Sequence, residues 1–134
     1  MNNREKILII DDEMAPRESI RMVLKDRYAV ATATGALEGL NMIAQEPVDL
    51  VVMDIKMPRM DGIEVLEEVR KDPALKLIPV VMLTSSRQDK DLLDSYINGV
   101  NAYVVKPVDF TKFSELMDTL GSYWMGWNKN PISN

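Results

Sequence analysis

The chain has 134 residues, enough for one domain with a substantial core, because a domain near this size buries roughly 68–70% of the surface that its unfolded chain exposes. Its 21 acidic and 16 basic residues give a net charge of −5, which argues against a surface that binds nucleic acid directly. The absence of cysteine and histidine excludes disulfides, thiol nucleophiles and histidine chemistry, so any metal must bind to oxygen ligands. No apolar run has the length of a signal peptide or a membrane span, and we therefore expect a cytoplasmic protein with no membrane contact.

Short runs of β-branched residues alternate along the chain with segments whose apolar residues recur every three or four positions. Strands are predicted at residues 7–10, 28–33, 50–53, 79–83 and 102–105. A helical segment follows each strand, and the central strands are apolar on both faces. This pattern predicts an α/β fold in which helices cover both faces of a parallel sheet.

The helices carry recognisable start and stop signals. The first is expected from about Pro16 to Asp26, Thr34 is expected to cap the second, and Gly99 is expected to end the fourth in a left-handed conformation. Asp109 can cap the fifth. The faces expected to be buried are Ile20, Val23 and Leu24 in the first helix, Leu37, Leu40, Ile43 and Ala44 in the second, Ile63, Leu66 and Val69 in the third, Leu92, Leu93, Tyr96 and Ile97 in the fourth, and Phe113, Leu116, Met117 and Leu120 in the fifth.

Four of the predicted strands end in polar side chains that are capable of chemistry: Asp11 and Asp12, Asp54, Thr84, and Lys106. Because the carboxyl ends of parallel strands meet at one edge of a sheet, we expect these groups to surround a single crevice. Three carboxylates in one place repel one another, and a hard divalent cation such as Mg²⁺ relieves that repulsion. The sequence therefore predicts a site for a metal ion and a phosphoryl group.

Each of these residues also has an ordinary interpretation. The acidic pair could simply cap the first helix, Asp54 could be a turn residue, Thr84 could be structural, and Lys106 could be a solvated loop lysine. In the functional reading, Asp54 is a carboxylate nucleophile that forms an aspartyl phosphate, and a cis bond before Pro107 aims Lys106 inward. The shared position of all these residues at strand ends favours the functional reading.

Over about residues 5–121 the chain resembles the receiver domains of bacterial two-component response regulators. The matching segments are Asp11-Asp12, DIKMPRMDG at 54–62, Leu83-Thr84-Ser85, and YVVKP at 103–107. The resemblance implies a doubly wound, flavodoxin-like fold, with a five-stranded parallel sheet of strand order 2-1-3-4-5 and five helices on both faces.

The resemblance also implies a role for each residue of the site. Asp54 would be the phosphoacceptor, Asp12, Asp54 and the backbone carbonyl of Lys56 would bind Mg²⁺ or Mn²⁺, Asp11 would assist through water, and Thr84 and Lys106 would contact the phosphoryl group. Tyr103 matches an aromatic position that changes rotamer on activation, although it could be an ordinary strand tyrosine with a hydrated hydroxyl. Phosphorylation would then alter the surface formed by the fourth helix, fifth strand and fifth helix.

The resemblance implies a signalling module and not an enzyme, apart from self-phosphorylation with small donors and autodephosphorylation. A histidine kinase or histidine phosphotransfer protein would donate the phosphoryl group, and a downstream protein would read the altered surface. Lys56 lies two residues beyond Asp54, and if its side chain leans over the phosphoryl group it would control the access of hydrolytic water. The alternative is that Lys56 is an ordinary solvated lysine.

Two other functions fit part of the sequence. One is an interaction module with a receiver fold that is never phosphorylated. The other is an aspartate-nucleophile phosphatase that resembles the haloacid dehalogenase group. That group needs a second Asp two residues after a nucleophile that follows the first strand, whereas here the first strand is followed by Asp11-Asp12-Glu13, and no cap insertion is visible.

The predicted receiver domain spans residues 1–121, and residues 122–134 form an aromatic tail with no separate output domain. The tail contains Tyr123, Trp124 and Trp127, and it resembles the endings of single-domain, phytochrome-associated receivers. These aromatic residues either fold back onto the core of the domain or form a docking surface, with a homodimer as one outcome.

Overall fold

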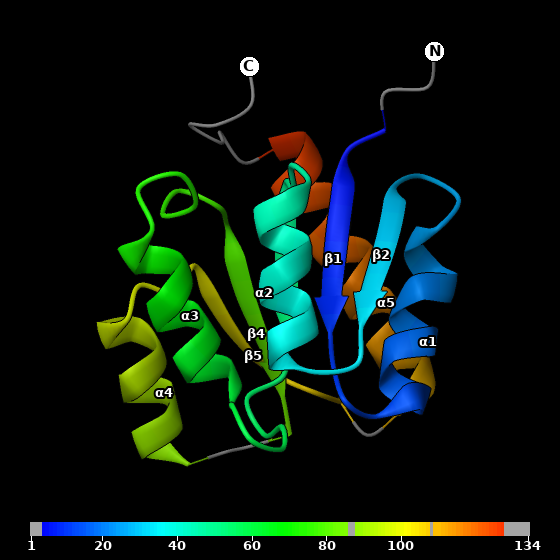
Figure 1. The fold of residues 1–134 in the computed structure, drawn as a ribbon. Helices are drawn as coiled ribbons and strands as arrows, with labels where there is room; N and C mark the ends of the chain where they lie inside the picture. Colours follow the sequence, from blue (N-terminus) through cyan, green and yellow to red (C-terminus); the bar gives the residue numbers. More distant parts are fainter. Residues whose placement is uncertain (1–3, 86–87, 108, 128–134) are drawn as a thin grey trace.

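A computed structural model describes residues 4–85, 88–107 and 109–127 (Figure 1). Its elements are β1 (Lys6–Ile10), α1 (Met14–Leu24), β2 (Ala29–Ala33), α2 (Ala36–Gln45), β3 (Leu50–Met53), α3 (Gly62–Lys71), β4 (Val80–Thr84), α4 (Asp89–Ile97), β5 (Ala102–Val105), α5 (Phe110–Ser122) and a π-helical segment, η1 (Tyr123–Trp127). The predicted alternation of five strands with five helices is confirmed. Within the described ranges, none of the helices has the length and apolar character needed to cross a bilayer.

The five strands form one parallel sheet in the order β2-β1-β3-β4-β5, which confirms the predicted topology. In Figure 1 all the strands run downward, so their carboxyl ends meet at the lower edge. In the register between β1 and β3, Ile10 pairs with Met53. The residues that follow this pair, Asp11 and Asp54, are therefore neighbours at that edge.

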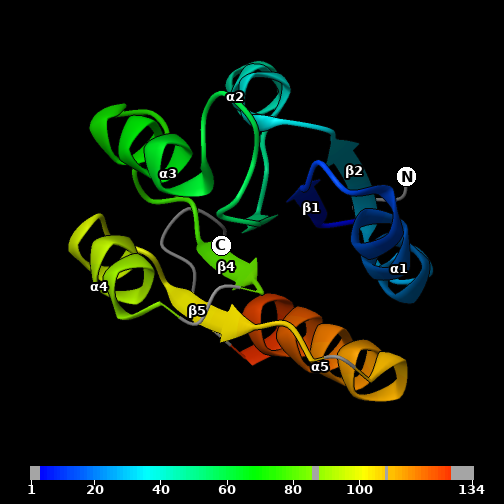
Figure 2. The same cartoon turned by 90° about the horizontal axis from the view of Figure 1, so that it is seen from below.

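Alternate residues of the central strands point into two separate apolar layers, because successive side chains of a strand face opposite ways. Leu8, Val51 and Met82 belong to the layer covered by α2 and α3, and Ile9 and Val52 belong to the layer covered by α1 and α5. Figure 2 shows the same division, with α2, α3 and α4 on one side of the sheet and α1 and α5 on the other. The site is thus held by strands that are buried on both faces.

The structure corrects two details of the second helix. Thr34 does not cap α2, because the N-cap residue is Gly35, which has no side chain to form a cap hydrogen bond. The backbone amide of Thr34 instead donates to Glu38 Oε1 at 2.7 Å. The buried face is also rotated from the predicted one. Leu37 and Ala44 are exposed, Leu40 is half-buried, and the buried residues of the helix are Ala36, Gly39 and Ile43.

The predicted buried face of α4 is wrong. The four apolar residues expected to face the core are all exposed, namely Leu92, Leu93, Tyr96 and Ile97. Among the positions of α4 whose burial the structure describes, the buried ones are polar, namely Asp91 and Ser95. The apolar stripe of α4 therefore faces outward. Gly99 ends this helix region with φ +88°, as predicted.

The remaining helices agree with the prediction in most of their core residues. Ile20 and Leu24 of α1 are buried and Val23 is half-buried, and the helix begins two residues before Pro16 and ends two residues before Asp26. Leu66 and Val69 of α3 are buried, while Ile63 is half-buried. Asp109 caps α5 by accepting a hydrogen bond from the Lys112 amide at 3.1 Å, and the helix buries Phe113 and Met117 while Leu116 and Leu120 are half-buried.

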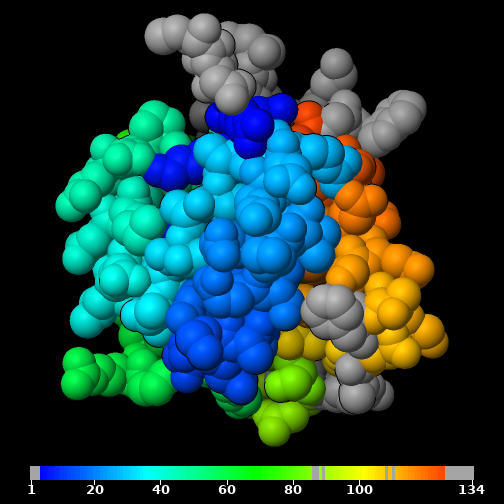
Figure 3. All heavy atoms as spheres, turned by 90° about the vertical axis from the view of Figure 1, so that its right-hand side faces the viewer, coloured from blue at the N-terminus to red at the C-terminus, as the bar shows by residue number. Residues whose placement is uncertain are grey.

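The aromatic segment after α5 packs back onto the domain. Trp124 is buried in the apolar layer shared by α1 and α5, whereas the adjacent Tyr123 is 49% exposed. The side chain of Trp127, the last residue of η1, lies outside what the structure describes. Figure 3 shows α1 and α5 side by side on this surface, and Arg27, in the turn after α1, forms an ion pair with Asp118 of α5. Trp124 is therefore a core residue in this chain, and an interface role for Tyr123 stays a prediction.

Candidate functional site

Two buried carboxylates lie at the centre of the site, one after β1 and one after β3. The backbone amide of Asp11 donates to Ala33 O at 3.2 Å, and that of Asp54 donates to Ile10 O at 3.1 Å, so each acid extends the sheet by one residue. Both side chains are buried. Asp54 Oδ1 accepts a hydrogen bond from the Ile55 amide at 2.7 Å, which fixes its orientation.

Lys106 joins these two carboxylates. Its Nζ donates to Asp11 Oδ2 at 3.0 Å and to Asp54 Oδ2 at 3.3 Å, and its side chain is only 12% exposed. Its backbone amide donates to Thr84 O at 2.8 Å, which places Lys106 beside the end of β4. Residues from four strands thus meet at one point, as the strand-end pattern predicts.

The electrostatics of this pair of acids favour an added cation. Burial raises the pKa of Asp11, and the nearby charge of Asp54 raises it further, although the Glu13 amide and Lys106 act in the opposite direction. Burial by itself would lower the pKa of Lys106, but the attraction of Asp11 and Asp54 outweighs burial and raises it. Lys106 therefore stays charged, yet one ammonium does not fully compensate the buried carboxylates.

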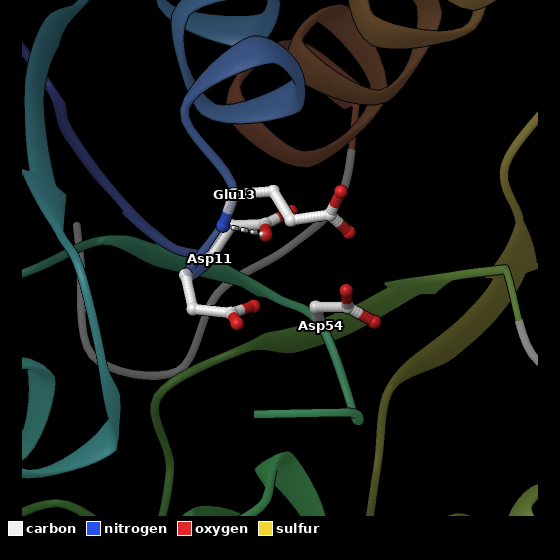
Figure 4. Close-up of side chains that lie close together, drawn as sticks. Asp11, Glu13 and Asp54 are labelled. Carbon is white, nitrogen blue, oxygen red and sulfur yellow. Dashed lines mark hydrogen bonds between the residues drawn. The ribbon is translucent and has the colours of Figure 1, made fainter. Parts of the chain in front are cut away.

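Two exposed acids complete the cluster. One carboxylate oxygen each from Asp11, Asp12, Glu13 and Asp54 lies within 4.8 Å of the others. Figure 4 shows Asp11, Glu13 and Asp54 gathered at the strand ends, with the hydrogen bond from the Glu13 amide to Asp11 Oδ1 at 2.9 Å. Sequence reasoning missed Glu13, although its position directly after the acidic pair was a usable signal. Clustered carboxylate oxygens are the ligands that Mg²⁺ prefers.

The loop from β3 to α3 forms one wall of the site and is tightly built. Asp61 caps α3 through a reciprocal pair of hydrogen bonds with Glu64. The Gly62 amide donates to Ile55 O at 2.9 Å, and a Cβ added to Gly62 would lie 2.3 Å from the carbonyl oxygen of Asp54. Gly62 is thus required for α3 to start against the backbone of Asp54.

The other predicted site residues lie around this centre. Thr84 is fully buried at the end of β4. Tyr103 lies on β5, opposite Met82 of β4, and packs half-buried against the layer covered by α2 and α3. The Lys56 side chain is directed toward α4, with Nζ 3.5 Å from Asp91 Oδ2. The predicted cis bond before Pro107 is wrong, since no peptide bond among the described residues is cis.

The fold and the site define an α/β protein with a buried aspartate, a lysine and an acidic cluster at the carboxyl edge of a parallel sheet. The family model of the response regulator receiver domain matches residues 7–118. The chain therefore belongs to the response regulator receiver family. Proteins of this class are signalling modules that work through phosphorylation and are in general not enzymes.

Individual relatives agree with this assignment. The chemotaxis protein CheY-3 of Vibrio cholerae is 34% identical over 122 residues, covering 90% of this chain and 94% of that protein. The structure of the phosphorylated cyanobacterial phytochrome response regulator RcpA matches with a TM-score of 0.91 at 29% identity, over 96% of this chain and 99% of that one. The Mn²⁺-bound form of response regulator Rcp1 matches with a TM-score of 0.87 at 28% identity, over 95% of this chain and 99% of that one. The predicted resemblance to phytochrome-associated regulators is confirmed.

Other curated relatives are longer. The chain spans 53% of a probable methanogenesis regulatory protein of Methanothrix harundinacea and 41% of a probable transcriptional regulator of Guillardia theta.

Proposed function

We propose that the chain accepts a phosphoryl group on Asp54 and thereby switches a surface that another protein recognises. The observation that carries this proposal is the contact of one buried lysine with two buried carboxylates, and the other oxygen of each accepts a backbone amide, from Glu13 at Asp11 and from Ile55 at Asp54. Of the two acids, Asp54 is the one at the position of the phosphoacceptor in the receiver family, directly after β3. A carboxylate held in this way is oriented for attack on phosphorus, and carboxylates are established nucleophiles toward phosphoryl groups.

The acidic cluster fits a divalent cation. The donor set consists of carboxylate oxygens, and within the described part of the chain these carboxylates outnumber the one ammonium that contacts them, that of Lys106. We assign Asp12, Asp54 and the backbone carbonyl of Lys56 as ligands of Mg²⁺ or Mn²⁺, with Asp11 assisting through water. When bound, the cation would offset the negative charge that builds up between the carboxylates and a phosphoryl group. The Mn²⁺-bound structure of the similar Rcp1 supports this assignment.

Lys106 and Thr84 are the residues that would form new contacts with a phosphoryl group on Asp54. Lys106 already lies within hydrogen-bond distance of Asp54, and the hydroxyl of Thr84 belongs to the adjacent strand end. A hydrogen bond to a charged group contributes roughly 1.5–3 kcal/mol, and moving a two-state balance from 1:99 to 99:1 needs about 5.5 kcal/mol. Two or three new contacts therefore suffice. Tyr103 would then fill the space that Thr84 leaves.

The surface that we assign to partner recognition includes the outer face of α4. This face exposes four apolar side chains: Leu92, Leu93, Tyr96 and Ile97. Figure 2 shows α4 beside β5, the strand that contains Tyr103. Because the chain contains no histidine, the donor must be another molecule, and a histidine kinase or a histidine phosphotransfer protein fits the receiver family.

The proposal is tested by incubating the protein with acetyl phosphate, with and without Mg²⁺, and measuring the intact mass. Wild type is expected to gain about 80 Da, the mass of one phosphoryl group, only when Mg²⁺ is present. Asp54→Asn should gain nothing, whereas Asp49→Asn, a change to an acid near the opposite edge of the sheet, should behave like wild type. Equal labelling of wild type and Asp54→Asn would refute the assignment.

A further inference from the structure

An ion pair connects the loop that follows Asp54 to helix α4. Lys56 Nζ lies 3.5 Å from Asp91 Oδ2, and the two side chains differ strongly in burial, with 61% of Lys56 exposed and only 9% of Asp91 exposed. Asp91 is therefore the fixed partner, held within α4, while Lys56 is a long side chain that reaches it through solvent.

Lys56 has an alternative destination. It is two residues from Asp54, beside a cluster that holds the carboxylates of Asp11, Asp12, Glu13 and Asp54. Among the described residues, the ammonium that contacts those carboxylates is that of Lys106, and its ion-pair partners there are Asp11 and Asp54. An exposed ammonium beside such a cluster is attracted to it, because several negative charges remain unbalanced. The ion pair with Asp91 keeps the Lys56 ammonium away from the cluster.

Hydrogen bonds anchor the carboxyl-terminal end of α4, which is the end farther from Asp91. Arg70 of α3 donates from Nε to Gly99 O at 3.0 Å, and from its two terminal nitrogens to Ile78 O at 2.7 Å and Asn101 Oδ1 at 2.8 Å. These bonds fix the turn that follows α4. The amino-terminal end of α4, which carries Asp91, contacts the loop after Asp54 through the ion pair with Lys56, so a change at the site can reach α4 at this end.

We infer that Asp91 is a positioning residue that holds the Lys56 ammonium away from the acidic cluster, and so keeps the cluster open to a divalent cation and to hydrolytic water. The inference rests on the proposed function and identifies a residue that regulates the phosphorylation site. By thermodynamic reciprocity, a cation in the cluster favours the contact between Lys56 and Asp91, while a phosphoryl group attracts Lys56 and weakens that contact. The state of the site is thereby coupled to α4.

The first test uses Mg²⁺ alone, with isothermal titration calorimetry of wild type, Asp91→Asn, Lys56→Ala and the double variant. Asp91→Asn is expected to raise the Kd for Mg²⁺ by about two- to five-fold, because the released ammonium competes with the cation at a partly screened distance. The same substitution should have no effect in the Lys56→Ala background. Asp94→Asn is the matched control. It removes the acid of a different ion pair on α4, the one between Asp94 and Lys90, and should leave the Kd unchanged.

The second readout is the lifetime of the phosphorylated protein, measured by intact mass after removal of the donor. Asp91→Asn should lengthen the lifetime severalfold, because Lys56 then covers the phosphoryl group and hinders the attacking water. Lys56→Ala should cancel that gain. Far-ultraviolet circular dichroism checks that each variant is folded.

The outcomes separate the inference from the proposed function. An Asp91→Asn effect that is absent, or equally large in the Lys56→Ala background, overturns the inference even if Asp54 is phosphorylated normally. Failure of wild type to gain a phosphoryl group refutes the proposed function, while the Mg²⁺ titrations still decide whether Asp91 positions Lys56. Wild type that binds no Mg²⁺ overturns both.

Discussion

The substitution Gly62→Ala tests the construction of the site most severely. A Cβ at this position would lie 2.3 Å from the carbonyl oxygen of Asp54, and 3.1 Å from the carbonyl carbon of Asp54 and the Cα of Ile55. All three neighbours are backbone atoms, which cannot rotate away as the end of a flexible side chain can. The start of α3 and the residue after β3 must therefore move apart by about 1 Å to reach ordinary van der Waals contact.

The cost of that displacement follows from two contributions. Overpacking of a well-packed region costs about 1–3 kcal/mol, and losing the hydrogen bond from the Gly62 amide to Ile55 O costs about 0.5–1.5 kcal/mol. The sum is about 1.5–4.5 kcal/mol, a large part of the roughly 5–15 kcal/mol that stabilises a typical domain. Because the displaced atoms belong to Asp54, the rate of phosphorylation should also fall, by about 100-fold for a shift of this size.

The assay is urea unfolding followed by circular dichroism, together with the rate of labelling by acetyl phosphate. Gly35→Ala is the matched control, because a Cβ there meets no atom within 4 Å and the backbone is extended, with φ −170°. Gly35→Ala should change the free energy of unfolding by less than about 1 kcal/mol, the usual range of an N-cap substitution. Equal destabilisation by the two substitutions would refute the reasoning.

Three further substitutions give distinct expectations. Ser95→Ala should raise the free energy of unfolding by about 1 kcal/mol, because the buried Ser95 hydroxyl has no hydrogen-bond partner among the residues that the structure describes; a lower urea midpoint would contradict this. Arg59→Gly should stabilise by about 0.5–1 kcal/mol, since Arg59 adopts φ 70°, and an unchanged midpoint would count against the strain. Lys106→Met should cost about 3 kcal/mol without metal, because it leaves the buried carboxylates of Asp11 and Asp54 unpaired. Mg²⁺ should stabilise that variant more than it stabilises wild type, and an equal gain in both would disprove the charge argument.

The sequence predicts the fold and the centre of the site because both depend on strands. Four residues at strand ends, Asp11, Asp54, Thr84 and Lys106, meet because parallel strands end at one edge of the sheet. No tertiary detail is needed for that conclusion. The register that pairs Ile10 with Met53 then sets the two acids side by side.

The helix faces could not be predicted as well. Periodicity identifies an apolar stripe, but it does not say whether that stripe faces the core or a partner, and on α4 the packing favours Asp91 and Ser95 inside. The contact between Lys56 and Asp91 was also beyond sequence reasoning, because it joins a loop to a helix that lies next to it only in the folded chain. Glu13 was missed because its contribution depends on how the chain turns after Asp12.

The most direct test of the central claim is to identify the residue that carries the phosphoryl group. Borohydride reduction of the protein after treatment with acetyl phosphate and Mg²⁺ converts an aspartyl phosphate to homoserine, which peptide mass spectrometry locates. The account predicts homoserine at position 54 and at no other acid of the cluster. Homoserine at position 11 or 12 instead, or no reduced residue in a protein that has gained the phosphoryl mass, would contradict it.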